Sequence, residues 1–414
     1  MTQQQRTQVV IIGAGPSGSV AAALLHQQQI DVIVLEKSTF PRFSIGESLL
    51  PACMEVIEQA KMLDAVTAAG FQFKDGAAFR YQDKYTTFDF NDKFTAGPAT
   101  TYQVQRGQFD KVLADEAVTQ GVEIRYEHAV EAIECLESKS VLTVTGANKK
   151  SYTLEADFVL DASGFGRVLP RLLALEKPSH LPPRKAIFCH VTDHINAEKC
   201  SVDYDRNKIL ISVHPHSADV WYWLIPFSNG TCSLGVVAPP QWLADYGDDS
   251  LAVLKQLVNE EPGLATILAA AEYPIKAATI EGYSANVTQL ATSNYALLGN
   301  AGEFLDPVFS SGVTIAMKSA QLAANVLTRS FAGEKVDWQC DYAQPLMLGV
   351  DTFRTYVEGW YSGELQRVIF HPNPDRKIKQ MICAILAGYA WDTNNPFVTQ
   401  SQRRLAVVAA LCAE

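Results

Sequence analysis

The sequence predicts an α/β protein with a Rossmann-like nucleotide-binding domain, an inserted β-rich domain and a helical C-terminal region. Three observations support this prediction. A β-turn-α-β pattern opens the chain, residues 184–237 alternate between β-branched, aromatic and polar residues, and the segment after residue 331 has helical periodicity throughout. The 414 residues are 48% hydrophobic and 19% charged, which excludes a disordered or fibrous chain and allows two or three packed domains.

The first forty residues carry the clearest pattern. Residues 9–12 form an apolar run typical of a strand buried on both faces, and the glycine-rich segment from Gly13 to Gly18 follows at once. Residues 19–29 are rich in alanine and leucine and predict a helix. Residues 31–35 predict a second strand, which Glu36 closes. This order and length are those of a parallel crossover unit.

The remaining elements are expected in the following order. Helices are predicted at residues 52–68, 109–119, 250–271 and 313–331, and strands at 77–90, 122–126, 129–135, 141–144, 158–160 and 295–298. Residues 184–237 predict a mostly antiparallel sheet. We therefore expect a discontinuous nucleotide-binding domain of residues 1–75, 100–180 and 280–331. Residues 76–99 and 181–279 would form the β-rich substrate domain, and residues 332–414 the helical region.

Charge and targeting features restrict the class of protein. The net charge is −11, which argues against nucleic acid, because that ligand is bound mainly by lysine and arginine. No apolar stretch reaches the length of a membrane span, and the N-terminus lacks the apolar core of a secretory signal. The eight cysteines are scattered, which predicts small buried thiols in a reducing compartment. We expect a soluble, cytoplasmic protein without a bound metal.

The glycine motif predicts a dinucleotide site. Gly13 allows the tight turn, Gly15 lets the backbone approach a diphosphate, and Gly18 allows close packing of helix on strand. The helix N-terminus offers free N–H groups to the diphosphate. Glu36 can accept a hydrogen bond from a ribose 2′-hydroxyl and would repel a 2′-phosphate, so we expect FAD or NAD rather than NADP. A second glycine segment at residues 164–169 lacks the third glycine, and we interpret it as a structural loop.

Several separated motifs now make the chain resemble a known family. They are Gly46-Glu47-Ser48-Leu49-Leu50-Pro51, Gln105-Arg106-Gly107-Gln108-Phe109-Asp110, Trp221-Tyr222-Trp223-Leu224-Ile225-Pro226, and the loop from Phe304 to Gly312. With Lys74 in the segment after Gln72, they resemble those of FAD-dependent halogenases of the pyrrole and phenol type, within the p-hydroxybenzoate-hydroxylase-like flavoprotein monooxygenases. The resemblance runs to about residue 330 and implies the GR2, p-hydroxybenzoate-hydroxylase-like version of the Rossmann fold.

The resemblance implies a role for each matched residue. Glu47, Ser48, Arg106, Asn300 and Gly312 would contact FAD. Lys74 would be the catalytic lysine. The loop residues Pro307, Ser310, Ser311 and Gly312 would bind halide and the flavin, because free N–H groups at a helix start attract anions. Trp221 and Trp223 would keep substrate away from the flavin.

The implied reaction converts reduced FAD, O2 and halide to hypohalous acid, which Lys74 directs to an electron-rich aromatic or pyrrole ring. A desolvated lysine suits this role because it loses its proton readily. A separate flavin reductase would supply reduced FAD, and the substrate would be a small aromatic molecule, free or tethered to a carrier protein. Such enzymes serve secondary-metabolite biosynthesis.

Three departures from the family keep alternatives open. Asn300 stands where the family usually has aspartate, Phe309 stands where tryptophan-type members have glutamate, and the region after about Leu346 matches no halogenase tail. The second hypothesis is therefore a non-halogenating FAD oxidoreductase, either a hydroxylase or a polyprenyl or polyene reductase. A third is a catalytically silent flavin-binding partner. Residue patterns alone also allow an exposed sheet lysine at Lys74 and two core tryptophans.

Other chemistry-bearing residues favour structural interpretations. His190 and His194 are four apart and His214 and His216 two apart, but neither pair has a third ligand at suitable spacing, so we expect structural histidines. Asp248-Asp249 and Glu260-Glu261 are interpreted as solvated helix ends. No G-x-S-x-G motif is present, which argues against an α/β-hydrolase.

Overall fold

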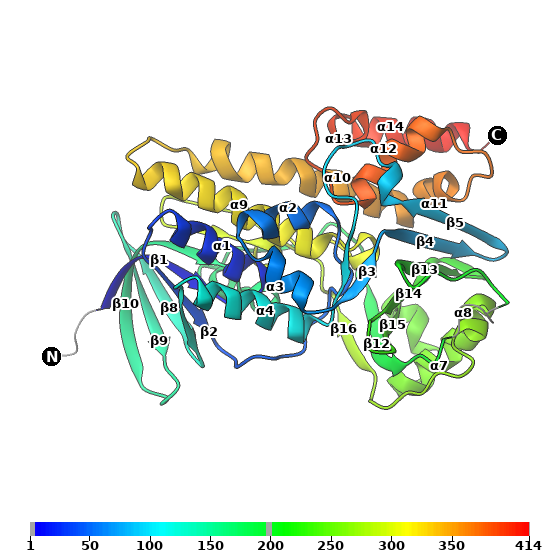
Figure 1. Ribbon diagram of the computed structural model, residues 1–414, viewed down its shortest axis with the longest axis horizontal. Helices are drawn as coiled ribbons and strands as arrows, with labels where there is room; N and C mark the ends of the chain where they lie inside the picture. The colour runs from blue at the N-terminus through cyan, green and yellow to red at the C-terminus, as the bar shows by residue number, and fades with distance from the viewer. Residues whose placement is uncertain (1–4, 196–200, 414) are drawn as a thin grey trace.

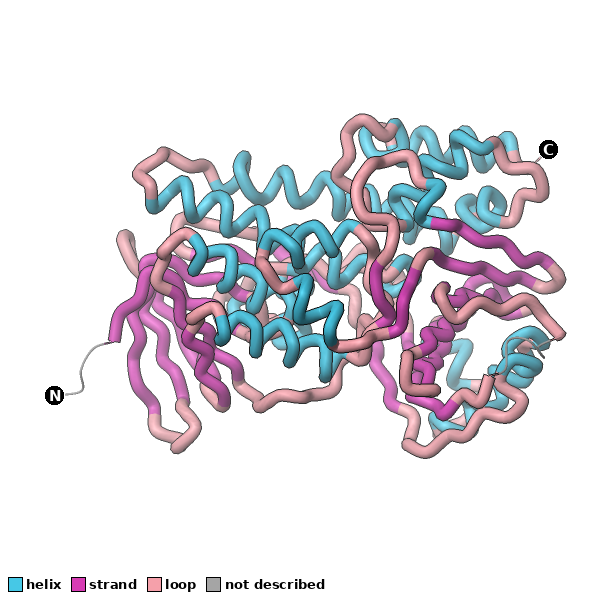
Figure 2. The backbone as a smooth tube through the Cα atoms, in the orientation of Figure 1, coloured by secondary structure: helices cyan, strands magenta, loops and turns pink. Residues whose placement is uncertain are grey.

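The structure, a computed structural model, describes residues 5–195 and 201–413. Its strands form two main sheets that lie side by side, and helices lie between and above these sheets (Figure 1). Figure 2 shows the same arrangement, with the strands gathered at the two ends of the molecule and helices in the centre and along the top.

The first sheet has seven strands in the order β7-β2-β1-β10-β9-β8, with β18 paired to β10. The bounds are β1 Gln5–Ile12, β2 Val32–Glu36, β7 Glu123–Tyr126, β8 Ala129–Cys135, β9 Ser140–Thr145, β10 Ser151–Asp161 and β18 Tyr295–Leu297. The pairs β1–β2, β1–β10, β2–β7 and β10–β18 are parallel, so their carboxyl ends meet at one edge. The dinucleotide motif after β1 therefore lies at the edge where such folds bind ligands.

Helices cover this sheet. Helix α1 (Pro16–Gln27) packs against α4 (Arg106–Thr119) and against the long α9 (Ser311–Phe331). The shorter helices α2 (Ala52–Gln59) and α3 (Leu63–Ala68) extend the same layer (Figure 1). The α/β prediction and the Rossmann-like architecture are confirmed by this arrangement.

The second sheet has seven strands in the order β16-β12-β15-β14-β13-β4-β5. Its strands are β4 Gly76–Tyr81, β5 Lys84–Asp89, β12 Lys185–Thr192, β13 Lys208–His214, β14 Ser217–Pro226, β15 Thr231–Ala238 and β16 Ala278–Glu281. One face packs on the main core, and the other on α7 (Ser250–Glu260) and α8 (Pro262–Ile267). The alternation along β14 separates these faces: Trp221 and Trp223 belong to the main core, and Tyr222 to the other.

Short elements connect the two sheets. The pair β3 (Gln72–Lys74) and β6 (Thr101–Gln103) lies between them, and β11 (Glu176–Pro178) pairs with β17 (Ala285–Val287). The small helices α5 (Val168–Leu172) and α6 (Pro240–Ala244) follow β10 and β15.

The C-terminal region is helical, as predicted. It contains α10 (Gln344–Tyr361), α11 (Glu364–Ile369), α12 (Arg376–Leu386), α13 (Pro396–Thr399) and α14 (Ser401–Leu411). Helix α10 packs on α9, and α12 packs on β5, so this region joins the two sheets from above (Figure 1).

Several detailed predictions are wrong. The helix expected at 52–68 is two helices, and that expected at 250–271 breaks at Glu261 because this carboxylate caps α8 through the N–H groups of Gly263 and Leu264. Glu261 is therefore buried rather than solvated. The second sheet is mostly antiparallel, as predicted, with one parallel pair, β13–β4. Cys135 and Cys340 are exposed rather than buried. Cys200 and the first four residues lie outside the described part of the chain.

Candidate functional site: a cavity between the two sheets

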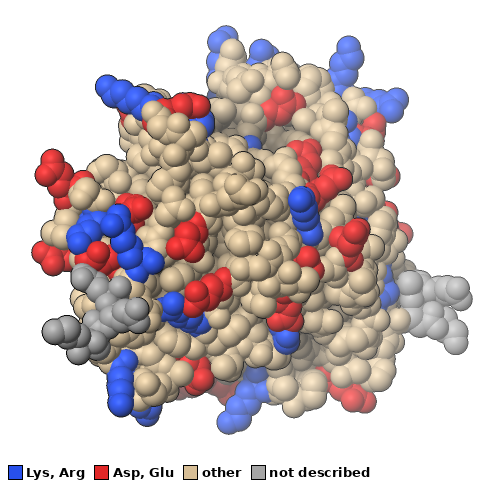
Figure 3. Space-filling view, turned by 60° about the vertical axis from the view of Figure 1, so that its left-hand side comes forward, with Lys and Arg blue, Asp and Glu red and all other residues tan. Residues whose placement is uncertain are grey.

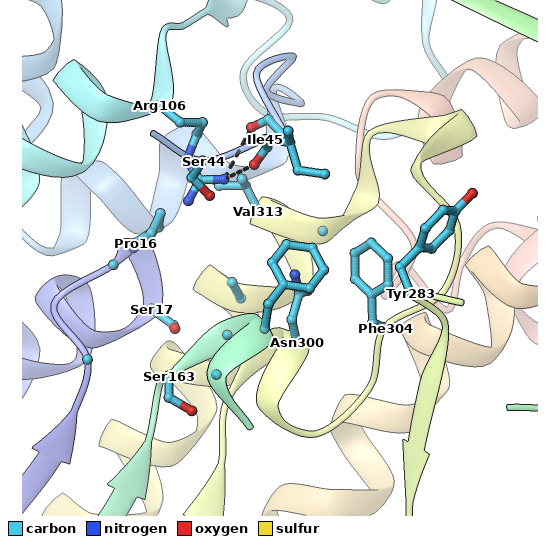
Figure 4. A pocket seen from close by; sticks show the side chains of 18 of the residues that line it. Pro16, Ser17, Ser44, Ile45, Arg106, Ser163, Tyr283, Asn300, Phe304 and Val313 are labelled. Carbon is cyan, nitrogen blue, oxygen red and sulfur yellow. Dashed lines mark hydrogen bonds between the residues drawn. The ribbon is translucent and has the colours of Figure 1, made fainter. Parts of the chain in front are cut away.

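A cavity of about 440 Å³ opens where the carboxyl edge of the first sheet meets the main-core face of the second. Its walls come from segments far apart in the sequence: the α1 N-terminus, residues 42–48, the end of β10, and the loop from Asn300 to Ala316. In the close-up, Pro16, Ser163, Asn300 and Phe304 surround the hollow (Figure 4). The fold therefore brings motifs that are far apart in the sequence, such as the glycine motif after β1 and the loop before α9, to the same cavity.

The predicted glycines form a diphosphate cradle. Gly13 has a φ of +98°, and a Cβ there would lie 2.7 Å from the Ala162 carbonyl oxygen. A Cβ on Gly18 would lie 1.9 Å from the Gly13 carbonyl oxygen, so Gly18 serves packing rather than lining. Gly15 lines the cavity and precedes α1 without any side-chain cap. Pro16 has no N–H, so the Ser17 and Gly18 N–H groups of this uncapped helix start would face an anionic diphosphate, and the cradle fits FAD.

Glu36 lies at the end of β2, inside this cradle. Its carboxylate oxygens accept hydrogen bonds from the Ala14 and Ser38 N–H groups, both at 2.9 Å. Arg42 lies 3.8 Å from the same carboxylate. A carboxylate has about four lone-pair positions, so acceptor capacity remains for a ribose hydroxyl. Glu36 is thus held rigidly in the cavity wall where the motif predicted it.

Arg106 begins α4 and also lines the cavity. It pairs with the fully buried Asp110 through Nε at 2.7 Å. It also donates to the Ile45 carbonyl oxygen at 2.6 Å, as Figure 4 shows. These contacts fix both the guanidinium and the segment that leads to Glu47 and Ser48. The planar group is therefore a fixed positive charge in the cavity wall.

The loop before α9 provides a second set of backbone donors. Ser310 adopts the left-handed conformation, with φ at 56°, and α9 begins at Ser311 without a side-chain cap. Pro307, Ser310, Ser311 and Gly312 all line the cavity, as does Asn300. The uncapped start of a 21-residue helix attracts an anion or an electronegative oxygen.

Lys74, at the end of β3, is completely buried, which rules out an exposed sheet lysine. Its Nζ donates to Ser48 Oγ and to the Leu49 carbonyl oxygen, each at 2.7 Å. Ser48 lines the cavity, whereas Lys74 lies one hydrogen bond behind that wall. Burial lowers the pKa of the Lys74 amine to about 7. The amine therefore exchanges its proton near neutral pH.

Trp221 and Trp223 form part of the cavity wall on the side of the second sheet. Both are buried, and their rings lie 6.0 Å apart. Trp223 Nε1 donates to Ser233 Oγ at 3.0 Å, and Trp221 Nε1 donates to the Tyr361 hydroxyl at 3.0 Å. They are core residues and cavity walls at the same time, so the two interpretations of the sequence do not exclude each other.

Glu47 has a partner that the sequence did not indicate. Its carboxylate lies 2.7 Å from His190 Nε2, and Glu47 is buried in the cavity wall. His214 lies 3.2 Å from Glu260, and His194 lies 3.4 Å from Glu272. Each of these three histidines thus contacts one carboxylate. Among the described residues no group of three or more potential ligands could hold a metal ion.

Asp306 and two tyrosines are further residues that the sequence analysis did not select. Asp306 Oδ2 accepts hydrogen bonds from Tyr361 at 2.9 Å and from Tyr283 at 3.2 Å, and Asp306 and Tyr283 line the cavity. Burial raises the pKa of the Asp306 carboxyl to about 6, although these bonds oppose the shift. The sequence analysis included Asp306 in the loop from Phe304 to Gly312 but gave it no role.

The second glycine segment, residues 164–169, lines the same cavity as the first. It forms a 3-10 turn, Gly164–Gly166, after β10, and Arg167 then donates to the Asn300 carbonyl oxygen at 3.1 Å. The segment thus supports the first nucleotide site, in line with its interpretation as a structural loop.

On the face shown in Figure 3, acidic and basic side chains are interspersed. Within residues 5–195 and 201–413, no helix is both long and apolar enough to span a bilayer.

Comparison with known families and proteins relates the chain to FAD-binding proteins. Residues 6–179 match the FAD binding domain family. The chain is 30% identical over 350 residues to the flavin-dependent halogenase armH3 of Armillaria mellea, covering 79% of this chain and 68% of that one. It is 28% identical over 337 residues to a chlorinase of 1H-pyrrole-2-carbonyl groups on a peptidyl-carrier protein from Pseudomonas fluorescens, covering 76% of this chain and 74% of that one. Against armH1 of Armillaria mellea it spans 65% of the relative's length.

Solved structures agree on the fold. A flavoprotein/dehydrogenase from Cytophaga hutchinsonii superposes with a TM-score of 0.94 at 42% identity over 99% of both chains. The flavin-dependent brominase Bmp2 superposes with a TM-score of 0.83 at 24% identity over 99% of this chain and 100% of that one. The likeness to these structures extends through the C-terminal helices, which had matched no halogenase tail.

Proposed function

Since the chain belongs to the FAD-dependent halogenases, within the p-hydroxybenzoate-hydroxylase-like flavoprotein monooxygenases, we propose that it halogenates an electron-rich ring with Lys74 as the directing amine. FAD is its cofactor, and bound reduced FAD supplies the two electrons that, with O2, a halide and a proton, yield oxidised FAD, hypohalous acid and water. The ring then exchanges one C–H hydrogen for halogen and releases a second water.

The observation that carries this proposal is the position of the Lys74 amine. It is fully buried, one hydrogen bond behind Ser48 in the cavity wall, and its pKa is lowered to about 7. A neutral amine that donates to Ser48 and to the Leu49 carbonyl oxygen keeps its lone pair, which can bind hypohalous acid. Lys74 would thus accept a hydrogen bond from the oxidant, and would then pass the proton released by the ring to the departing hydroxide, which leaves as water.

The other residues have binding and excluding roles in this proposal. The free N–H groups at the start of α1 and the Arg106 guanidinium hold the cofactor, with Glu36, Glu47, Ser48 and Asn300 along its length. The loop of Pro307, Ser310, Ser311 and Gly312 holds the halide and the flavin ring. Trp221 and Trp223 exclude substrate from the flavin side of the cavity.

Partners and domain roles follow from the same proposal. A separate flavin reductase provides reduced FAD, and the substrate is a small phenol or pyrrole. Two carrier-protein-dependent relatives, a chlorinase and a brominase, make a tethered pyrrole a reasonable form of it. We propose residues 76–99 and 181–279 as the substrate domain and residues 332–414 as a region that closes it. A cytoplasmic location accords with the need for a reductase.

A non-halogenating FAD oxidoreductase is the second candidate. It is favoured by Asn300, in place of the aspartate usual in the family, and by the 42% identity to a protein described as a flavoprotein/dehydrogenase. This candidate predicts that the purified protein itself oxidises NADH or NADPH, whereas the halogenase depends on the added reductase.

One experiment separates the candidates. The FAD-loaded protein is incubated with a reactive phenol, bromide and a flavin reductase, and the products are identified by mass spectrometry. The halogenase predicts a brominated phenol that requires bromide and the reductase. Hydroxylated phenol without any brominated phenol, or reduction of the bound flavin by NADPH alone, would favour the second candidate.

A further inference from the structure

Two tryptophans form the wall of the cavity, and their N–H groups are held in different ways. Trp223 donates to Ser233 on the neighbouring strand β15, so the second sheet holds it by itself. Trp221 donates to the hydroxyl of Tyr361, the last residue of α10. One wall residue therefore depends on the C-terminal helical region.

The Tyr361 hydroxyl uses both of its hydrogen-bonding capacities. It accepts from Trp221 Nε1 at 3.0 Å and donates to Asp306 Oδ2 at 2.9 Å. Asp306 in turn accepts from the Val308 N–H at 3.1 Å, which fixes the turn before the α9 loop. Tyr361 thus links the second sheet directly to the loop beside the flavin site.

The ring of Tyr361 is held from the other side as well. The Arg184 guanidinium carbon lies 3.9 Å from the ring centroid. Arg184 is itself fixed by two hydrogen bonds to the Asp219 carboxylate, both at 2.7 Å. These contacts fix the ring, so the Tyr361 hydroxyl stays in one position. A residue that only filled space would not need its hydroxyl fixed in this way.

We propose that Tyr361 is a positioning residue, which holds the Trp221 wall at a fixed distance from the Asp306 loop. This inference rests on the proposed halogenase function and assigns a role in it to the C-terminal region. Without the hydroxyl, the indole N–H and one Asp306 oxygen lose a buried partner, and the wall can move away from the flavin loop. Substrate then reaches the flavin side, and oxidant is lost as hydroxylated product and hydrogen peroxide.

The first test reads the contact without any turnover. In protein labelled with ¹⁵N at the tryptophan indoles, Trp221→Phe identifies the Trp221 resonance in the wild-type spectrum. Tyr361→Phe should shift this resonance and speed its hydrogen exchange by about fivefold, the factor expected for loss of one hydrogen bond. The matched control is Tyr356→Phe on the same helix, because the buried Tyr356 hydroxyl has no partner in the described part of the chain. An unchanged Trp221 resonance in Tyr361→Phe would overturn the proposal.

The second test reads the consequence for the reaction. With bromide, a reactive phenol and a flavin reductase, Tyr361→Phe should raise hydroxylated phenol and hydrogen peroxide per FAD oxidised several-fold at the expense of brominated phenol. Tyr356→Phe should behave as wild type. Trp221→Phe removes the donor of the same hydrogen bond, so it should also raise hydroxylated phenol and hydrogen peroxide. Adding Tyr361→Phe to Trp221→Phe should then change the products little.

The outcomes separate this proposal from the function on which it rests. Suppose that wild type brominates the phenol, and that Tyr361→Phe gives the same ratio of brominated phenol to hydroxylated phenol and hydrogen peroxide. This result would overturn the positioning role alone. Additive effects in the double variant would also overturn it, because they place Tyr361 outside the Trp221 contact. Absence of bromination by wild type would overturn the proposed function instead. If Tyr361→Phe does not fold, the hydrogen exchange of the Trp221 indole in wild type decides, because exchange as fast as that of an unbonded indole would overturn the contact.

Discussion

The buried amine of Lys74 predicts a pH dependence of stability that the substitution Lys74→Met should remove. Burial lowers the Lys74 pKa from 10.5 to about 7 in the folded protein, whereas the unfolded chain retains the ordinary value. Between these pH values the unfolded state binds the proton and the folded state does not. The free energy of unfolding therefore rises with pH through this range.

The size of the effect follows from the two pKa values. Moving from pH 6.5 to pH 9.0 should raise the contribution of Lys74 to the free energy of unfolding by about 2.5 kcal/mol. Other groups titrate over the same range, so the quantity to measure is the difference between wild type and Lys74→Met at each pH. This difference should change by the full amount, with wild type gaining relative to the variant as the pH rises.

The assay is urea unfolding at several pH values, followed by tryptophan fluorescence and by far-UV circular dichroism, whose coincidence verifies a single transition. Lys84→Met, at an exposed lysine on β5, is the control and should show a constant difference from wild type. A constant difference for Lys74→Met as well would refute the buried, easily deprotonated amine.

Three other substitutions test individual contacts. Gly18→Ala should weaken FAD binding by more than about tenfold, because its Cβ would meet the Gly13 carbonyl oxygen and displace α1; titration of the apoprotein with FAD measures this, and unchanged affinity would contradict the cradle. Ser48→Ala removes an acceptor from the Lys74 ammonium, so the pKa of Lys74 should fall further, and the acid limb of the pH–rate profile should move to lower pH. An acid limb that stays in place would contradict that contact. Asn300→Asp restores the family's residue and should tighten FAD binding several-fold by the same titration, with equal or weaker binding as the opposing result.

Local patterns predicted the parts of the site that depend on contiguous residues. The glycines after β1, Glu36 at the end of β2 and the loop before α9 each lie within one strand-turn-helix passage, where sequence order determines position. For this reason the Rossmann-like fold and FAD as cofactor could be predicted and are confirmed by the comparisons.

Contacts between distant segments could not be predicted in the same way. Glu47 and His190 are 143 residues apart, and Trp221 and Tyr361 are 140 apart, so no periodicity relates them. The burial of Lys74 depends on β3, a strand of three residues whose surroundings come entirely from tertiary packing. Helix 52–68 divides because the chain turns at Lys61, which has a φ of 56°, a conformation that residue type alone did not indicate.

Product analysis of Lys74→Met tests the claim that this amine directs the halogen. Wild type, Lys74→Met and Lys318→Met, a half-buried lysine on α9, are each loaded with FAD and supplied with a flavin reductase, bromide and a reactive phenol. Wild type and Lys318→Met should yield brominated phenol. Lys74→Met should consume reduced FAD at a similar rate and yield about a hundredfold less brominated phenol or below, the contribution typical of a positioned proton-transfer group. Equal bromination by Lys74→Met and wild type would contradict the account.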